Sequence, residues 1–293
     1  MSYNKNNVWI EDLRGFINFT QTGFMSSFVK PTYQMLAEGD SWFHIGGNTG
    51  FLKERNILDG VNFGGHHTMV LNMALSGDTM SNMSNNITSQ AFFRVLKTYE
   101  WDGLLISAGG NDLIDALTPE MNYKFKGKTL SIIQSSDSDS NFENYINKTH
   151  LDLFCECLLS HYQRFIDNKA KTRNRDKPVF VHVYDYPTPR NSPAKFLKIT
   201  KGPWVYNALN LKNVPQQYWQ KITDYIFDKL AETLLILNGS NNFQVIDTRN
   251  LLTRANAGDK GNSNDWLNEI HPNANGINKL CTKINVELTR FYK

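Results

Sequence analysis

Cysteine is scarce in this sequence, with only three among 293 residues. Three cysteines are too few for the disulfide framework that stabilises many small secreted folds. Cys155 and Cys157 stand two positions apart in a predicted helix, where side chains do not face one another. No spacing of cysteine and histidine resembles that of a zinc site. The sequence therefore predicts neither a disulfide scaffold nor a structural metal.

Long hydrophobic runs and strong net charge are also missing. No stretch of 18 uncharged apolar residues occurs, and the N-terminus has no apolar core of a signal peptide. We therefore expect no transmembrane segment; cytoplasmic residence is the default expectation, and export without a cleaved signal stays open. The net charge is only +3, and the richest basic stretch, residues 169–177, is typical of the solvated end of a helix. No nucleic-acid partner is expected, and the oligomeric state is not predicted.

Strand and helix patterns alternate along most of the chain. Strands are expected at 33–37, 66–75, 101–108, 178–184 and 243–247, and helices between Gly77 and Tyr99, at 150–168, after Pro215 and at 276–292. This alternation predicts one α/β domain over residues 33–293, with a central five-stranded parallel sheet covered by helices on both faces.

Three segments extend this core. Residues 1–32 are mixed polar and aromatic, and are expected to be an N-terminal extension packed on the domain. Residues 115–147 contain a polar serine and aspartate run and are predicted to be a surface insertion. Residues 187–213 place aromatic side chains among prolines and glycine. Because so long a loop in a compact domain is often functional, we predict that it forms a wall or lid of a substrate site.

Four residues whose side chains or backbone could take part in catalysis stand next to the predicted strands and the last helix. Ser41 follows Gly39 after the first strand, Gly77 follows the second, Asn111 follows the third, and His271 precedes the last helix. Because the carboxyl ends of parallel strands share one edge of a sheet, we expect these four to meet despite their separation in sequence.

The residue types suit acyl transfer. A hydroxyl nucleophile needs a base to take its proton, and imidazole titrates near neutral pH. A tetrahedral intermediate needs N–H donors aimed at its oxyanion, each worth about 2.7–4 kcal/mol of barrier. The backbone N–H groups of Ser41 and Gly77 and the side-chain amide of Asn111 could supply three donors. Asp40 and Asp112, beside two of these residues, are expected to brace the turns.

The order of these motifs resembles that of a known family. Gly39-Asp40-Ser41, Gly77, Gly110-Asn111-Asp112 and His271-Pro272 are similar to the four signature blocks of the SGNH (GDSL-type) hydrolases. The resemblance spans residues 36–273. It implies a flavodoxin-like three-layer α/β/α fold and ester hydrolysis through an acyl-serine intermediate, with no metal or organic cofactor. By the same resemblance, Ser41 is the nucleophile and His271 the base. Ser41, Gly77 and Asn111 are the oxyanion donors.

One position departs from the family pattern. The family usually has an acid three residues before the histidine, whereas this chain has Asn268. An amide oxygen accepts a hydrogen bond from the imidazole but does not stabilise an imidazolium as a carboxylate does. Three alternatives follow: Asn268 orients the ring, Asp265 or Glu269 reaches it instead, or the activity is weakened. We favour Asn268.

The sequence therefore predicts a serine esterase that acts on a small acyl, O-acetyl or lipid ester, with a small-molecule, lipid or glycan ester as its partner. Two alternatives stay open. One is acyl transfer to a sugar or lipid alcohol. The other is a catalytically weak or inactive binding module with the same fold, which Asn268 keeps in consideration.

Overall fold

The computed structural model describes residues 2–3, 6–22, 30–45, 55–85, 87–196 and 199–293. Its centre is a seven-stranded sheet in the order β1-β2-β4-β3-β5-β8-β11. Six of these strands run parallel, and only β1 pairs antiparallel. The strands are β1 (Ser2–Tyr3), β2 (Val8–Glu11), β3 (Tyr33–Gly39), β4 (Thr68–Asn72), β5 (Gly103–Ser107), β8 (Val179–His182) and β11 (Phe243–Ile246).

The sequence predicts five parallel strands, whereas the structure has six. The sixth strand is β2, which comes from the N-terminal extension and pairs with β4. Its four residues are all buried, and they include Glu11, whose carboxylate accepts a hydrogen bond from the indole N–H of Trp9. A four-residue strand that contains a glutamate has no clear periodicity, so only its pairing with β4 identifies it.

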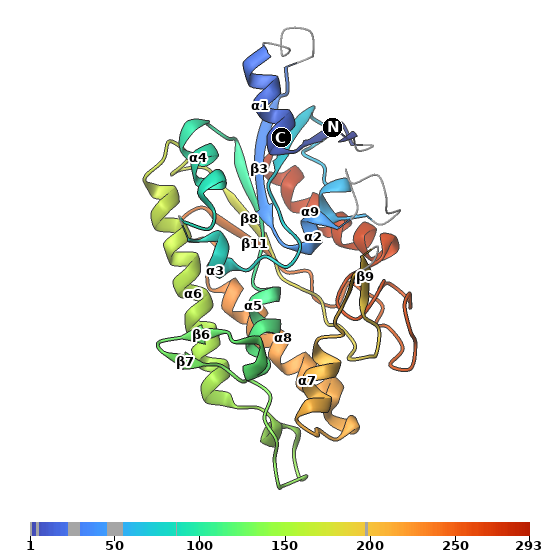
Figure 1. Cartoon of the computed structure of the whole chain (residues 1–293). Coiled ribbons are helices and arrows are strands. Elements are labelled where there is room, and N and C mark those ends of the chain that lie inside the picture. Colours follow the sequence, from blue (N-terminus) through green and yellow to red (C-terminus); the bar gives the residue numbers. More distant parts are fainter. Residues whose placement is uncertain (1, 4–5, 23–29, 46–54, 86, 197–198) are drawn as a thin grey trace.

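Helices cover both faces of the sheet (Figure 1). One face carries α4 (Gln90–Thr98), α6 (Lys148–Ala170) and α8 (Trp219–Leu235), where Phe92 of α4 lies against Phe165 of α6. The other face carries α9 (Ala274–Phe291). The arrangement is a three-layer, flavodoxin-like α/β/α sandwich, as predicted. Among the described helices, none combines the length and the apolar character needed to cross a bilayer.

Most predicted helices are confirmed with small shifts at their ends. The stripe expected on the helix after Pro215 is buried in α8, including Ile222 and Leu230. The helix expected before Tyr99 was placed too early, because Ile87 precedes α4 and is 77% exposed. The remaining helices are shorter: α1 (Leu13–Thr22), α2 (Ser41–His44), α3 (Met80–Met83), α5 (Gly110–Ala116), α7 (Val205–Leu211) and the 3-10 turns at Ile57–Asp59, Pro119–Met121, Phe142–Tyr145 and Gln216–Tyr218.

The two internal segments outside the core contain structure of their own. Residues 115–147 hold a hairpin of β6 (Lys124–Phe125) and β7 (Lys128–Thr129). Residues 187–213 hold a hairpin of β9 (Ala194–Phe196) and β10 (Ile199–Lys201), followed by α7. Both lie in the same part of the molecule as α5, the helix that directly follows β5 (Figure 1).

Candidate active site

Ser41 lies at the point where the sheet changes winding direction. The chain passes from β3 to β4 on one side and then returns to β5 on the other side of β3. In open α/β sheets ligands bind at such a switch point, beyond the carboxyl ends of the strands. Ser41 follows β3, Gly77 follows β4 and Asn111 follows β5. Three adjacent strands therefore deliver the three residues predicted to stabilise an oxyanion.

The turn before Ser41 is held by the buried carboxylate of Asp40. Its oxygens accept hydrogen bonds from the Trp42 backbone N–H at 2.9 Å, the Ser107 hydroxyl at 2.8 Å and the Tyr184 hydroxyl at 2.5 Å. Burial raises the pKa of Asp40 to about 6, although these hydrogen bonds oppose the shift. Asp40 is therefore a brace for the serine turn, as the sequence predicts, whereas its partner Tyr184 was missed.

Replacing Tyr184 with phenylalanine is expected to lower the free energy of unfolding by about 1–3 kcal/mol, because one buried carboxylate oxygen loses its donor. Urea denaturation at pH 7 measures this loss. Tyr99→Phe is the matched control, since Tyr99 is half-buried near α4 and its change should stay within about 0.5 kcal/mol. Equal effects in the two variants would contradict the role given to Tyr184.

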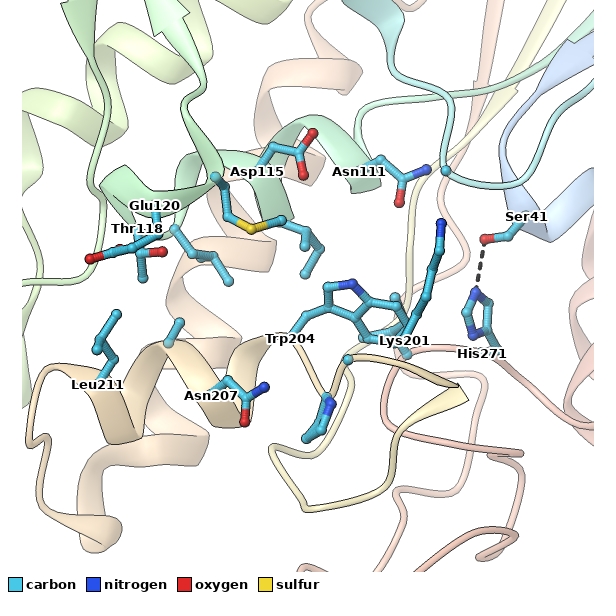
Figure 2. Close-up of a pocket in the computed structure, with 18 of the residues that line it drawn as sticks. Ser41, Asn111, Asp115, Thr118, Glu120, Lys201, Trp204, Asn207, Leu211 and His271 are labelled. Atoms are coloured by element: carbon cyan, nitrogen blue, oxygen red, sulfur yellow. Dashed lines mark hydrogen bonds between the residues drawn. The ribbon is translucent and has the colours of Figure 1, made fainter. Parts of the chain in front are cut away.

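His271 lies directly beside Ser41, 230 positions away in sequence (Figure 2). Its Nε2 is 2.8 Å from the Ser41 Oγ, and its Nδ1 is 2.9 Å from the Asn268 Oδ1. The Asn268 oxygen also accepts from the backbone N–H groups of Ile270 and His271, which fixes the orientation of the amide. Because an amide oxygen only accepts, the Nδ1 carries the proton and the Nε2 is free to accept from the Ser41 hydroxyl.

The imidazole of His271 is buried, with 5% of the residue exposed. Burial lowers its pKa to about 3, because the charged form is poorly solvated there. Its Nδ1 partner Asn268 is neutral, so this contact does not favour the charged form as a carboxylate would. The ring is therefore neutral and able to accept a proton across the whole physiological pH range.

The two acids considered as alternatives to Asn268 are used elsewhere. Asp265 forms an ion pair with Lys279 at 2.5 Å and accepts from the Thr253 N–H, and these contacts lower its pKa against the opposing effect of burial. Glu269 is fully buried and accepts from three consecutive backbone N–H groups, of residues 204–206. Burial raises the pKa of Glu269 to about 7, and the three N–H donors oppose this. Asn268 is the side chain placed to orient His271.

Gly77 and Asn111 are positioned by the turn that follows β4. Gly77 has a φ of +87°, a conformation that glycine adopts without strain. The Asn111 side-chain amide donates to the Asp78 carbonyl at 2.8 Å, which leaves its second N–H available. Among the described residues, no hydrogen-bond acceptor faces the backbone N–H of Ser41 or of Gly77. Both N–H groups are therefore available to a bound oxygen.

The Asp112 side chain stabilises the turn that follows Gly77. It is buried and accepts hydrogen bonds from the Met80 N–H at 2.7 Å, the Ser81 N–H at 3.3 Å and the Tyr123 hydroxyl at 3.1 Å. Burial raises the pKa of Asp112 to about 6. The bracing role predicted for Asp112 thus has clear partners, but Tyr123 comes from the 115–147 insertion and carries no signal in the sequence.

A cavity of about 780 Å³ opens over these residues (Figure 2). Ser41, Gly77, Asn111 and His271 all line it, so the structure brings together the four residues singled out by sequence. Most of the rest of its wall comes from residues 114–121 and 201–211, which belong mainly to the two internal segments outside the core. The 187–213 segment forms a wall of the cavity, as predicted. The 115–147 segment, predicted to be a surface insertion, also contributes residues to the cavity wall.

Trp204 is the aromatic residue of this wall that lies nearest the catalytic candidates. Its ring stands edge-on to the His271 ring, with the centroids 5.8 Å apart. Trp42, next to Ser41, is instead buried in the core and stacks on His182. Among the described residues, no group of three or more histidine, cysteine, aspartate and glutamate side chains is arranged to hold a metal ion.

Comparisons with known proteins identify the fold. No family model and no curated protein matches the sequence. A lipase from a goat rumen metagenome aligns with 87% of this chain and 97% of its own, at 15% identity and a TM-score of 0.50. An extracellular lipase from Streptomyces rimosus aligns with 89% of this chain and 100% of its own, at 12% identity and a TM-score of 0.50. The chain therefore shares the fold of these two solved lipases, and the three-layer α/β/α arrangement predicted from the sequence is confirmed.

Proposed function

We propose that this chain is a serine ester hydrolase in which Ser41 is the nucleophile and His271 the general base. The observation that carries this proposal is the continuous hydrogen-bonded line from Ser41 through His271 to Asn268 at the wall of a large cavity. A nucleophile, a base within hydrogen-bond reach and a third group that orients the base form the general pattern of activated hydroxyl catalysis.

In the proposed reaction, His271 Nε2 takes the hydroxyl proton as Ser41 Oγ attacks the ester carbonyl carbon. The carbonyl oxygen becomes an oxyanion, which the N–H groups of Ser41, Gly77 and Asn111 stabilise. The carbon–oxygen bond to the alcohol then breaks, and the alcohol leaves with the proton from His271. Water repeats the sequence on the acyl-serine, releasing the carboxylic acid and restoring the serine hydroxyl.

Because Asn268 replaces an acid, this proposal predicts a slower reaction than that of a full triad. The amide holds the ring in the productive tautomer but adds no negative charge, so the imidazolium formed during attack is stabilised less than in a Ser-His-Asp triad. The rate should therefore lie below that of a full triad while remaining dependent on Ser41. Because Asn268 is neutral, the alternative to a slow enzyme is a module that binds its ligand without catalysis.

Labelling with a fluorophosphonate probe tests the proposal directly. The probe forms a serine–phosphorus bond with an activated serine and loses fluoride, so the folded wild-type chain should be labelled at Ser41. Ser41→Ala should show no labelling. Ser76→Ala, which changes another serine lining the cavity, is the matched control and should be labelled like wild type. Absence of label on the folded wild-type chain would instead support the binding module.

A further inference from the structure

The cavity beside Ser41 extends far beyond the space that an acetyl group needs. Ser41 and His271 lie at one end of the view in Figure 2, Leu211 and Glu120 lie at the other, and Trp204 lies between. Cavities of 300–1,000 Å³ with mainly apolar walls are typical of small-molecule sites. The cavity volume of about 780 Å³ is therefore available to one substituent of the ester.

The inner wall of this cavity is apolar and well ordered by packing. Ile114, Leu117 and Ala208 are buried on opposite sides of it, from α5 and its C-cap and from α7. Three charged side chains also line the cavity: Glu120 and Lys201 are exposed, and Asp115 of α5 is half-buried. An extended hydrocarbon chain is the kind of group that gains from such a surface, because each buried methylene is removed from water.

The wall formed by α7 is tied to the loop that carries His271. Glu269, two residues before His271, accepts from the backbone N–H groups of residues 204–206 and so holds the start of α7. The ring of Tyr206 packs against Trp219, 5.2 Å between centroids. The wall is therefore held in place before substrate arrives, which lowers the ordering cost of binding.

The position of the oxyanion donors indicates which half of the ester enters this cavity. Asn111 and Ile114 are three residues apart on α5, so the oxygen-binding amide and the first apolar wall residue share one helix face. His271 has to face the leaving oxygen to protonate it, so the alcohol half lies on the His271 side of the ester. The alcohol half is thus directed toward His271, and the acyl half along the wall that begins at Ile114.

From this arrangement we infer that the substrate is an ester of a medium-chain fatty acid, with the acyl chain lying along α7 and ending at Leu211. The inference rests on the proposed function. From Trp204 to Leu211 the helix rises about 10 Å, which corresponds to an extended acyl chain of roughly eight carbons. Leu211 is the specificity-determining residue at the far end, where it lines the cavity and is 52% exposed.

Two isomeric esters separate the acyl from the alcohol assignment. Ethyl octanoate and octyl acetate have the same composition but carry the long chain on opposite sides of the ester. The purified full chain should hydrolyse ethyl octanoate with a kcat/KM at least about tenfold higher, because roughly two- to fourfold is gained for each buried methylene. A preference for octyl acetate, or equal rates, would overturn the acyl assignment.

Leu211→Trp tests the length limit. The larger side chain should lower kcat/KM for p-nitrophenyl octanoate at least tenfold and leave p-nitrophenyl acetate within twofold. Ile236→Trp, which adds the same bulk at an exposed position after α8, is the matched control and should change neither. An unchanged octanoate rate in Leu211→Trp would overturn the inference. If no ester shows hydrolysis that depends on Ser41, the proposed function itself fails, and that result is distinct from a changed chain-length profile.

Discussion

Replacing His271 with alanine is expected to lower kcat for ester hydrolysis by about 10³-fold. In a serine protease with a complete triad, losing the histidine costs about 10⁶-fold and losing the aspartate alone about 10⁴-fold, and these effects are not additive. Because this chain already has Asn268 in place of the acid, removing His271 should lower its kcat by a smaller factor. Because Asn268 still holds the correct tautomer, the remaining loss should exceed the roughly 10²-fold difference between those two values.

Steady-state kinetics on a p-nitrophenyl ester measures this effect. KM should change little, since His271 acts on the proton and its loss leaves the apolar wall of the cavity intact. His66→Ala is the matched control, because His66 lies just before β4 and its ring contacts Tyr33. A loss below about tenfold in His271→Ala, with Ser41 still required, would show that another group takes the serine proton.

The residues of the candidate site were predictable because four local patterns, each weak alone, follow one another in a specific order at the expected places in the fold. Glycines and polar residues after buried strands mark the turns at Ser41, Gly77 and Asn111, and the parallel topology brings the ends of those strands to one edge. The meeting of Ser41 with His271 follows from that topology, even though 230 positions separate them. The fold class predicted from the sequence was therefore enough to predict that Ser41 and His271 lie close together.

The partner of the histidine was not predictable in the same way. Asp265, Asn268 and Glu269 stand within five positions in an irregular segment, and the direction of a side chain in such a segment depends on what packs around it. The structure assigns Glu269 to the start of α7 and Asp265 to Lys279, which leaves Asn268 for the ring. Local sequence alone carries no information on these long-range contacts.

Two supporting elements were missed for related reasons. The strand β2 is short and includes a buried glutamate, so its pattern is weak without its partner β4. The hydroxyls of Tyr184 and Tyr123 hold the buried carboxylates of Asp40 and Asp112, but a tyrosine next to a strand is equally compatible with simple packing. Hydrogen bonds between distant side chains are set by tertiary structure rather than by any periodic pattern.

Changing Asn268 to aspartate is expected to raise kcat/KM at pH 8 by about 10- to 10³-fold. The Asn268 oxygen already accepts three N–H groups, two from backbone and one from His271, so a carboxylate in the same place would be well solvated by donors. An adjacent carboxylate raises the pKa of a histidine by about 1–3 units, and each unit corresponds to about 1.4 kcal/mol. This stabilisation is available to the imidazolium formed during attack.

The pH profile gives this prediction a second readout. In the wild type, burial holds the pKa of His271 at about 3, so the base form persists and His271 contributes no loss of activity down to about pH 4. In Asn268→Asp the pKa of His271 rises, so its protonated, inactive form appears at a higher pH and the gain shrinks as the pH falls. Asn238→Asp, between α8 and β11, adds the same charge at an exposed site and should change neither quantity. A large loss of activity at pH 8 in a folded Asn268→Asp chain would mean that the neutral amide is itself required.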